Sequence, residues 1–464
     1  MSITRREVLK NGVILSAATA AGVASNADAQ FGWKRPQQQF SGRRVLPFDP
    51  ENPAILYNRA NCQRCGDCVV VCKETQKVFG NGTTPSKLNC IYCGQCVANC
   101  WNNGVTERFH LQEIYNAIRD NRAQNGTKKF VAIVSPAVRA TLGEMFGFAP
   151  GTNVEKLIPS ALRRVGFDYV FDAVFGADLT VMEEAAELKA RLASGKKGPL
   201  FTSCCPAWVR FVELFYEDYV PNISSCKSPL LMHSAIIKTW FAKKMGWKPE
   251  DVVVAAITPC TAKKYERTLG ERRDLDFALT TREFGWWLME LEIPFAELEP
   301  SGFDSLLGEG SGAGALFGNT GGVTEAVLRT LYFENEAKKP PQDWLTLTPV
   351  RGLDGFRKAE IQLGDRTLRI GIVHGTGAAR DMFRVLKDVP FDFIEVMACR
   401  GGCIGGGGLP KTELPISDRL RTDRMGALFA RDKSSKVRLS SENPEIQALY
   451  RDFLKETGNE LLHR

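Results

Sequence analysis

Three short cysteine-bearing segments, far apart in the chain, constrain its fold more than any other feature. They read FTSCCPAW (residues 201–208), ITPCTAKKYE (257–266) and FIEVMACRGGCIGGGG (393–408). Each follows an apolar, strand-like run, and open α/β sheets bind their ligands at the carboxyl ends of strands. The segments therefore predict that several cysteines converge at strand ends. Thiolates select soft metals, above all iron–sulfur clusters, zinc and copper(I).

A second set of cysteines lies upstream, in two runs of identical spacing. Residues 62–72 read CQRCGDCVVVC and residues 90–100 read CIYCGQCVANC. Both follow C-x₂-C-x₂-C-x₃-C, the spacing of two-cluster ferredoxins, in which the fourth cysteine of each run ligates the other cluster. The two predicted 4Fe–4S clusters are held by Cys62, Cys65, Cys68 and Cys100, and by Cys72, Cys90, Cys93 and Cys96.

A zinc ribbon or a disulfide knot is the alternative interpretation of these runs. A zinc site needs only four thiolates and usually has a wider gap between its CxxC pairs. The proline that commonly follows the fourth cysteine is absent, because Lys73 and Trp101 stand there. This departure loosens the match to ferredoxins without changing the number of ligands.

Length and charge exclude some classes of function. A chain of 464 residues corresponds to about three domains. The formal net charge of +7 is modest, and the basic residues are scattered without interleaved aromatic residues, so there is no nucleic-acid-binding pattern. No apolar run is long enough to predict a stable membrane span.

The first thirty residues have the pattern of an export signal. A basic start precedes an apolar stretch from Val13 to Ala24 and a small-residue cleavage site at residues 27–29. Arg5 and Arg6 match the twin-arginine signal, with Val8 in place of the more usual Phe. The alternative is an ordinary secretory signal in which the two arginines are coincidental.

Cluster chemistry favours the twin-arginine interpretation. Metal sites rarely exist in an unfolded chain, so clusters loaded in the cytoplasm must cross the membrane inside a folded protein. The twin-arginine translocase carries folded cargo. We therefore expect residues 1–29 to be a twin-arginine signal peptide, residues 30–55 to be a linker, and the mature protein to be periplasmic. The fourteen cysteines of this exported chain then need no disulfides, because nearly all have a predicted metal partner.

Downstream of Lys128 the sequence alternates between strand and helix patterns. The strand candidates are Phe130–Val134, Leu200–Thr202, Val252–Ile257, Arg369–His374 and Phe393–Val396, and the helix candidates are Leu157–Val165 and Met182–Leu192. This alternation predicts an α/β fold with mostly parallel sheets flanked by helices, preceded by a small α+β domain of the bacterial-ferredoxin type.

Two glycine-rich stretches accompany this pattern, at residues 310–322 and 401–408. They are too irregular for a dinucleotide-binding fingerprint and lack an acidic ribose ligand at the right distance. Glycine here favours close approach of the backbone to a bulky inorganic ligand.

Taken together, TSCCPAW, TPCTAKK, EVMACRGGC and the two ferredoxin runs resemble the signature segments of the FeFe hydrogenases. The resemblance extends from about Asn61 to the C-terminus. It implies an H-cluster, in which a 4Fe–4S cube is joined to a two-iron subcluster with CO, cyanide and azadithiolate ligands. The implied ligands of the cube are Cys205, Cys260, Cys399 and Cys403, and the sulfur of the last one would bridge to the two-iron unit.

The resemblance implies roles for further residues. Cys204 matches the terminal proton donor and acceptor, a role that suits a thiol because its pKa is within reach of neutral pH. Lys263 matches the lysine that hydrogen-bonds a cyanide ligand. By sequence alone these two are a small buried residue and an exposed lysine. The remaining matches are Ser135, Pro136, Phe317 and Gly318, which face the diatomic ligands, and Met397, which packs against the two-iron unit.

A proton path can be carried over residue by residue. Glu184, Glu187 and Arg191 recur at i, i+3 and i+7, which places them on one helix face. Without the resemblance, this pattern is a solvated salt-bridge stripe. With it, the implied path runs through Cys204, Glu184, Ser224, Glu187 and Arg191, whose hydroxyl and carboxyl groups suit a proton relay. A complete path argues against a degenerate relative.

Two departures from the family pattern, one cysteine outside the motifs and the C-terminal tail remain to be described. Thr258 stands where members often have Met, and Ala207 stands where many have Gly. Cys226 belongs to no motif and is predicted to be a buried core residue. In the tail, the apolar residues Ile446, Leu449, Tyr450 and Phe453 recur with helical spacing. The tail resembles a portion that is a separate small subunit in some periplasmic relatives.

These observations predict the domain organisation and the function. We expect a ferredoxin-like domain at residues 56–105, an H-cluster domain at 106–439 and a helical small-subunit-like tail at 440–464. The implied reaction is 2H⁺ + 2e⁻ ⇌ H₂, run as periplasmic H₂ uptake, with electrons leaving through two 4Fe–4S clusters to a c-type cytochrome or a ferredoxin-like acceptor. The two-iron unit requires maturation enzymes.

Two other functions stay open at this point. One is a non-catalytic H-cluster-like sensor or iron–sulfur assembly protein. The other is a plain electron-transfer polyferredoxin, which leaves the four cysteines of the large domain unexplained.

Overall fold

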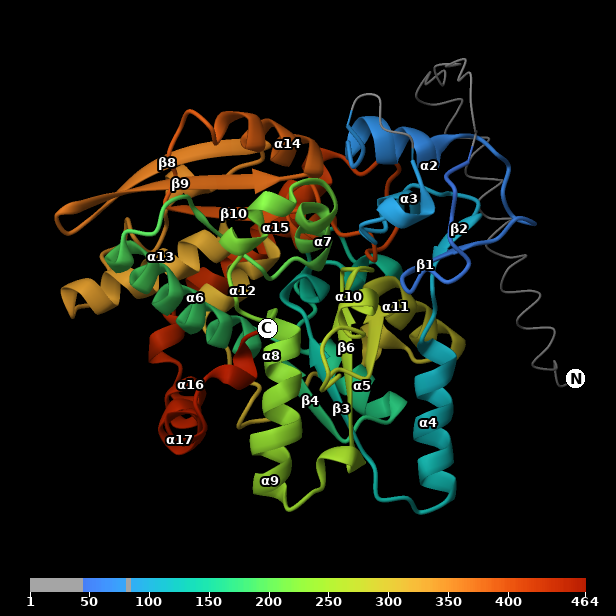
Figure 1. Cartoon of the computed structure of the whole chain (residues 1–464). Coiled ribbons are helices and arrows are strands. Elements are labelled where there is room, and N and C mark those ends of the chain that lie inside the picture. The colour runs from blue at the N-terminus through green and yellow to red at the C-terminus, as the bar shows by residue number, and fades with distance from the viewer. Residues whose placement is uncertain (1–44, 81–84) are drawn as a thin grey trace, which may run out of the picture.

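The computed structural model describes residues 45–80 and 85–464 (Figure 1). The predicted signal peptide and residues 30–44 of the predicted linker lie outside the described residues. No helix in the described part of the chain has the length and apolarity needed to cross a bilayer.

Two four-stranded sheets form the centre of the molecule. The first has the order β4-β3-β6-β7 and is parallel throughout. Its strands are β3 (Lys129–Val134), β4 (Tyr169–Asp172), β6 (Val252–Thr258) and β7 (Phe277–Thr280). The second has the order β5-β10-β9-β8, and only β8 runs antiparallel to its neighbour. Its strands are β5 (Leu200–Phe201), β8 (Phe356–Leu363), β9 (Arg366–His374) and β10 (Phe393–Met397).

Helices cover both faces of each sheet, as the apolar strands require. One face of the first sheet packs on α4 (Leu111–Ala123), α5 (Leu157–Val165) and α11 (Thr281–Glu290), and the other on α6 (Val174–Ser194) and α8 (Pro229–Ile236). The second sheet packs on α6 and α13 (Gly322–Glu336), and on α7 (Pro206–Phe215) and α14 (Thr376–Val385). The shorter or peripheral helices are α9 (Ala242–Met245), α10 (Lys263–Glu266), α12 (Gly312–Ala315) and α15 (Asp418–Ser434).

Helix α6 lies between the two sheets and belongs to both cores. Phe175 and Leu179 pack in the core of the first sheet, and Val181 and Leu188 pack in the core of the second. The helix is therefore apolar on two sides, which explains why its side chains are mostly buried along its length. Any carboxylate that it carries toward the sheet ends is removed from water.

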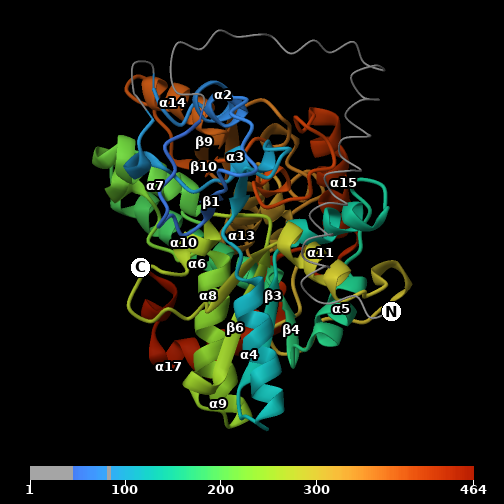
Figure 2. The same ribbon diagram turned by 90° about the vertical axis from the view of Figure 1, so that its right-hand side faces the viewer.

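The ferredoxin-like unit is small and built around its cysteines. Strands β1 (Ile55–Tyr57) and β2 (Val105–Glu107) pair antiparallel. Two short helices, α2 (Asp67–Val70) and α3 (Gln95–Ala98), begin inside the cysteine runs, and Gly66 and Gly94 precede them with φ of 90° and 69°. L side chains rarely adopt this conformation, so glycine is needed there. Both views place α2 and α3 on the side of the molecule that carries β9 and β10, away from α9 (Figures 1 and 2).

A buried ion pair fixes this unit to the large domain. Arg282 of α11 contacts Glu107 of β2 at 2.9 Å, and both side chains are buried. The same guanidinium donates to the carbonyl oxygens of Leu409 and Gly407, at the end of the third cysteine segment. Such a desolvated, fully bonded pair tolerates little movement, because breaking it leaves a buried charge.

The sequence predictions of fold class and elements are largely confirmed. All five predicted strands are present, and the predicted helix Leu157–Val165 is α5. The predicted helix Met182–Leu192 is the second half of the longer α6. Strands β4, β7 and β8 were not predicted.

The tail forms a helix interrupted by a π-helical turn. It consists of α16 (Pro444–Leu449), the turn η13 (Tyr450–Leu454) and α17 (Lys455–Thr457). Ile446 and Leu449 are buried in the core of the first sheet, as the apolar spacing predicted.

Candidate metal centres and active site

Four cysteines meet where the carboxyl ends of the two sheets face each other. Cys205 follows β5, Cys260 follows β6, and Cys399 and Cys403 follow β10. Burial raises the pKa of the Cys260 thiol to about 12, and the nearby Cys205 thiol contributes to this increase. Burial is the main cause that raises the pKa of Cys399 well above its ordinary value. The neighbouring thiols of Cys93, Cys260 and Cys205 raise it further. The predicted convergence of the three segments is therefore present.

The chemistry of this donor set fits a 4Fe–4S cube. A thiol removed from water loses its proton readily only when a metal ion binds its sulfur, because the thiolate is otherwise unsolvated. Four such thiols match the four-cysteine ligation of a cube. All fourteen cysteines, which lie within the described residues, are free thiols, so no disulfide knot is formed. The described part of the chain holds no group of three His, Cys, Asp or Glu side chains spaced for a single metal ion.

Glycines let the surrounding backbone approach this point closely. A Cβ atom at Gly402, whose φ is 93°, would lie 2.7 Å from the Thr320 amide nitrogen. A Cβ at Gly406 would lie 2.4 Å from the Pro259 carbonyl oxygen. The loop after β10 therefore packs directly on the backbone before Cys260 and on the segment after Gly318.

The five residues predicted to contact the diatomic ligands or the two-iron unit also lie at this junction. Ser135 and Pro136 directly follow β3, and Met397 ends β10. Phe317 packs in the same apolar core as Met397. A Cβ atom at Gly318 would lie 3.5 Å from the amide nitrogen after Pro136, so these segments are neighbours. All five residues are buried.

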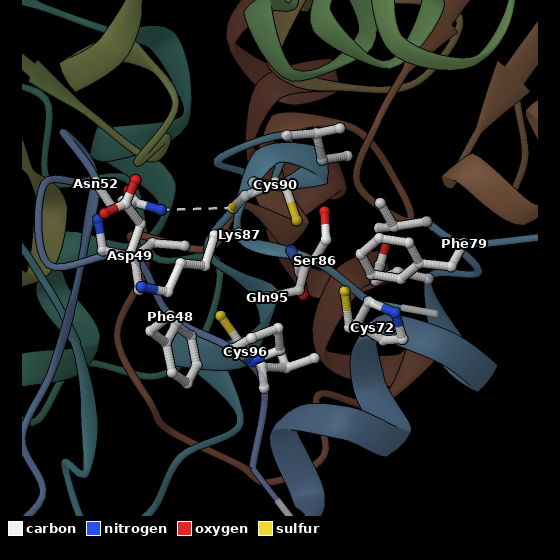
Figure 3. A pocket seen from close by; sticks show the side chains of 18 residues that line it. Phe48, Asp49, Asn52, Cys72, Phe79, Ser86, Lys87, Cys90, Gln95 and Cys96 are labelled. Carbon is white, nitrogen blue, oxygen red and sulfur yellow. Dashed lines mark hydrogen bonds between the residues drawn. The ribbon is translucent and has the colours of Figure 1, made fainter. Parts of the chain in front are cut away.

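The second predicted set of ferredoxin cysteines lines a single pocket. Cys72, Cys90, Cys93 and Cys96 all belong to its wall. Figure 3 shows the sulfurs of Cys72, Cys90 and Cys96 facing this space. Asn52 donates a hydrogen bond from Nδ2 to the Cys90 Sγ atom at 3.6 Å. The grouping is the one that the crossed ferredoxin spacing predicts, and the thiol set suits a cube.

The first predicted set lies nearer the surface. Burial raises the pKa of the Cys68 thiol to about 11, and Cys65, Cys100 and Cys62 raise it further, which places the four thiols together. Cys65 is exposed. The three groups of cysteines therefore lie in a row. The surface group adjoins the second through Cys68 and Cys72, and the second adjoins the strand-end group through Cys93 and Cys260.

Lys263 belongs to the second cysteine segment and connects it to the first. It begins α10, is buried, and donates from Nζ to the Cys204 carbonyl oxygen at 3.1 Å and to Glu266 Oε2 at 2.8 Å. Burial works against its charge, but Glu266 and the Cys260 thiol outweigh it and raise the pKa of Lys263. Lys263 is therefore a buried ammonium group at the strand-end site. Sequence reasoning missed Glu266, whose only signal is the i, i+3 spacing.

Glu184 is a buried carboxyl group beside Cys204. Its Oε1 atom accepts from the Ser203 amide at 3.3 Å, and its Oε2 atom has no hydrogen-bond partner within the described residues. Burial raises the pKa of Glu184 to about 8. Burial is the main cause that raises the pKa of Cys204 well above its ordinary value, and the nearby Glu184 carboxyl raises it further. The two groups are adjacent, and a carboxyl that is protonated near neutral pH can both donate and accept a proton.

The outer part of the predicted proton path is only partly connected. Ser224 donates from its hydroxyl to Glu187 Oε2 at 2.6 Å. Arg191 lies on α6, as Glu187 does, but its guanidinium donates to the carbonyl oxygens of Lys197 at 3.1 Å and Gly198 at 3.2 Å. The structure therefore pairs Cys204 with Glu184, and Ser224 with Glu187, while Arg191 braces the turn after α6.

Gln95 is a further residue at the strand-end site, and sequence reasoning did not predict it. Gln95, inside the run CGQC, donates from Nε2 to the Cys399 Sγ atom at 3.3 Å and to the Gly405 carbonyl oxygen at 2.8 Å. It is buried between the second ferredoxin group and the strand-end group. Its position inside a cysteine run, where polar groups reach sulfur, was the available signal.

The departures from the family pattern are buried close to the site. Thr258 is the last residue of β6, two residues before Cys260, and Ala207 lies in the first turn of α7. Cys226 is fully buried in the core of the first sheet, as predicted.

Comparison with known families decides the classification. The family described as iron only hydrogenase large subunit, C-terminal domain, matches residues 128–407. The family described as iron hydrogenase small subunit matches residues 418–464. The chain belongs to the iron-only hydrogenase family. Membership supports hydrogenase activity and an H-cluster with iron–sulfur clusters.

Individual relatives of this iron-only hydrogenase agree with the family match. It is 39% identical over 429 residues to the NADP-reducing hydrogenase subunit HndD of Solidesulfovibrio fructosivorans, covering 89% of this chain and 67% of the relative. It is 38% identical over 368 residues to the periplasmic [Fe] hydrogenase large subunit of Nitratidesulfovibrio vulgaris, covering 77% of this chain and 86% of the relative. The apo [FeFe]-hydrogenase HydA1 of Chlamydomonas reinhardtii has a TM-score of 0.67 and 36% identity, covering 76% of this chain and 98% of that one.

Proposed function

We propose that this protein catalyses the reversible reaction 2H⁺ + 2e⁻ ⇌ H₂. The observation that carries the proposal is the convergence of four half-buried thiols at strand ends, beside Cys204 and Glu184. Cys205, Cys260, Cys399 and Cys403 would hold the cube of the H-cluster. When bound, the H-cluster supplies the iron chemistry that splits or joins hydrogen.

The protein's own residues would then manage the protons. Cys204 stands next to the metal ligand Cys205 and next to Glu184, so it can exchange a proton with that carboxyl group. Within the described part of the chain the Oε2 atom of Glu184 has no hydrogen-bond partner, so it can take part in this exchange. Beyond this point, the hydroxyl of Ser224 and the carboxylate of Glu187 continue the relay toward the surface. Glu184 and Ser224 are buried, so these groups can carry protons where bulk water does not reach.

Electrons would leave by the row of cysteine groups. Two 4Fe–4S clusters would connect the strand-end site to the surface. The inner cluster would be held by the predicted set that contains Cys90, and the outer cluster by the set that contains Cys62. Amide donors reach sulfurs of both groups, from Tyr92 to Cys90 and from Val105 to Cys100, and such bonds tune reduction potentials.

The setting of the reaction is part of the proposal. The twin-arginine pattern supports export by that translocase to the periplasm, and the similarity to a periplasmic large subunit is consistent with it. H₂ uptake with electron transfer to a c-type cytochrome suits that location. Maturation enzymes would supply the two-iron unit. We also propose the division into residues 56–105, 106–439 and 440–464, with residues 1–29 removed as a signal peptide.

Replacing Cys65 tests whether electrons leave the protein through the outer cluster. In the matured enzyme under H₂, Cys65→Ser should lower the rate of c-type cytochrome reduction at least tenfold, because the outer cluster loses a thiolate ligand. Exchange of H₂ with D₂O should persist, since it needs no electron exit. Both rates would be measured on the same preparation.

Two results would contradict this proposal. Unchanged cytochrome reduction by Cys65→Ser would remove the outer cluster from the path. No cytochrome reduction by a wild-type enzyme that exchanges isotopes would exclude this class of partner while leaving the hydrogenase activity intact.

A further inference from the structure

The last residues of the chain pair with the segment that carries Ser224. The Lys227 amide donates to the Leu462 carbonyl oxygen at 2.8 Å, and the Arg464 amide donates to the Ser225 carbonyl oxygen at 2.9 Å. Between these two bonds, Cys226 and His463 form an antiparallel bridge. The carboxyl end of the chain therefore adds a short extended pairing to the outer part of the proton path.

Side chains of the tail strengthen this pairing. The Arg464 guanidinium donates to the carbonyl oxygens of Ser224 and Cys226, both at 3.4 Å. The His463 ring bonds through Nδ1 to the Ser225 hydroxyl at 2.8 Å. The amide of Ser225 in turn donates to both carboxylate oxygens of Glu187 at 3.2 Å. Tail, serine segment and Glu187 thus form one continuous set of contacts.

A buried carboxylate on α6 anchors the tail from the other side. Glu183, the neighbour of Glu184, accepts from Asn459 Nδ2 at 3.0 Å and 3.1 Å, from His463 Nε2 at 3.1 Å, and from the Tyr450 hydroxyl. Among the described residues, these side-chain donors all belong to the tail. Because an unpaired buried carboxylate is costly, the tail and α6 are mutually dependent.

His463 joins the two elements that must meet for proton transfer. One ring nitrogen contacts Glu183 on α6, and the other contacts Ser225 in the serine segment. The Ser224–Glu187 hydrogen bond of 2.6 Å spans the same two elements. Its length is therefore set by how firmly the segment is held against the helix.

We propose that the tail is a positioning element of the proton exit, in which His463 holds the Ser224 hydroxyl on the Glu187 carboxylate. This inference rests on the proposed hydrogenase function and assigns the small-subunit-like tail a part in it. His463 acts through Ser224 and Glu187 and takes no proton itself. Misplacement of a reacting group by about 1 Å can slow a step about 100-fold, so a loosened segment should slow proton exit markedly.

The test compares two replacements of His463 in the full-length, matured holoenzyme. His463→Ala should lower H₂ oxidation turnover about 10- to 100-fold and raise the solvent deuterium isotope effect on turnover. Amide hydrogen exchange at residues 224–227 should accelerate. His463→Gln, which can accept from Ser225 and donate to Glu183, should restore most of the turnover and the slow exchange.

The control is Arg451→Ala, which removes an exposed tail side chain that pairs with Asp452 at the surface. It should match the wild type in all three measurements. Unchanged turnover and isotope effect in His463→Ala would overturn the proposal, as would an equal loss in His463→Ala and His463→Gln, which would make the imidazole itself a proton carrier. An inactive wild type with a loaded H-cluster would instead refute the proposed function.

Discussion

Cys204→Ser is expected to lower H₂ turnover about 10²- to 10⁴-fold, in both directions of the reaction. That range is what a positioned proton donor and acceptor contributes to a rate. A serine hydroxyl keeps the size of the thiol but holds its proton far more tightly near neutral pH, so transfer to Glu184 is lost. Turnover would be measured as H₂ evolution with a reduced viologen and as H₂ oxidation with an oxidised one.

The cluster should survive this change, because Cys204 is not one of the four predicted ligands. Ser234→Ala is the control. It removes a buried hydroxyl of α8 that donates to the Leu230 carbonyl oxygen and belongs to neither the predicted cluster ligands nor the proton path, and it should retain turnover within about threefold of wild type. Wild-type turnover in Cys204→Ser would contradict the proton role. A wild type that binds the H-cluster without turnover would support the sensor or assembly alternative.

Glu184→Gln is expected to lower turnover by a similar factor, about 10²- to 10⁴-fold, because glutamine cannot pass on the proton of Cys204. The same substitution is expected to raise the free energy of unfolding at high pH, although it lowers turnover. Burial raises the pKa of Glu184 to about 8 in the folded protein, above its ordinary value of 4.5. The folded state therefore retains a proton that the unfolded state releases, and this contribution is complete below about pH 4.5 and lost as the pH rises through 8.

The variant should therefore be as stable as the wild type at pH 5 and more stable at pH 9, by about 5 kcal/mol at most. Denaturant unfolding of both proteins at pH 5, 7 and 9 measures the difference. Glu456→Gln, at an exposed position of the tail, is the control and should follow the wild type. Equal pH dependence in Glu184→Gln and wild type would show that the Glu184 carboxyl is not held protonated by burial.

The parts of the fold that the sequence predicted are those encoded locally. Cysteine spacing specifies the ferredoxin-like unit, and apolar runs such as residues 252–258 specify buried parallel strands. Strand β8 reads FRKAEIQL and alternates polar with apolar residues, as an edge strand exposed on one face does, but it is followed by no cysteine segment and was not predicted. Strands β4 and β7 are four residues long, and no cysteine segment follows them as one follows the two-residue strand β5.

The site was predicted where residues lie next to a motif and missed where contacts depend on the tertiary fold. Cys204 and Lys263 stand beside cluster-type cysteines in the sequence. By contrast, Glu183 and His463 are 280 positions apart and meet only because the tail packs on α6. The orientation of Arg191 is likewise set by the turn that follows its helix, which helical spacing does not contain.

Infrared spectroscopy of the anaerobically purified, matured protein tests the central claim most directly. Under H₂ the CO and CN stretching region should show bands, and these bands should shift when argon replaces H₂, which would establish an H-cluster that reacts with hydrogen. A region that stays blank after addition of a synthetic two-iron precursor, in a protein that carries its iron–sulfur cubes, would contradict the account.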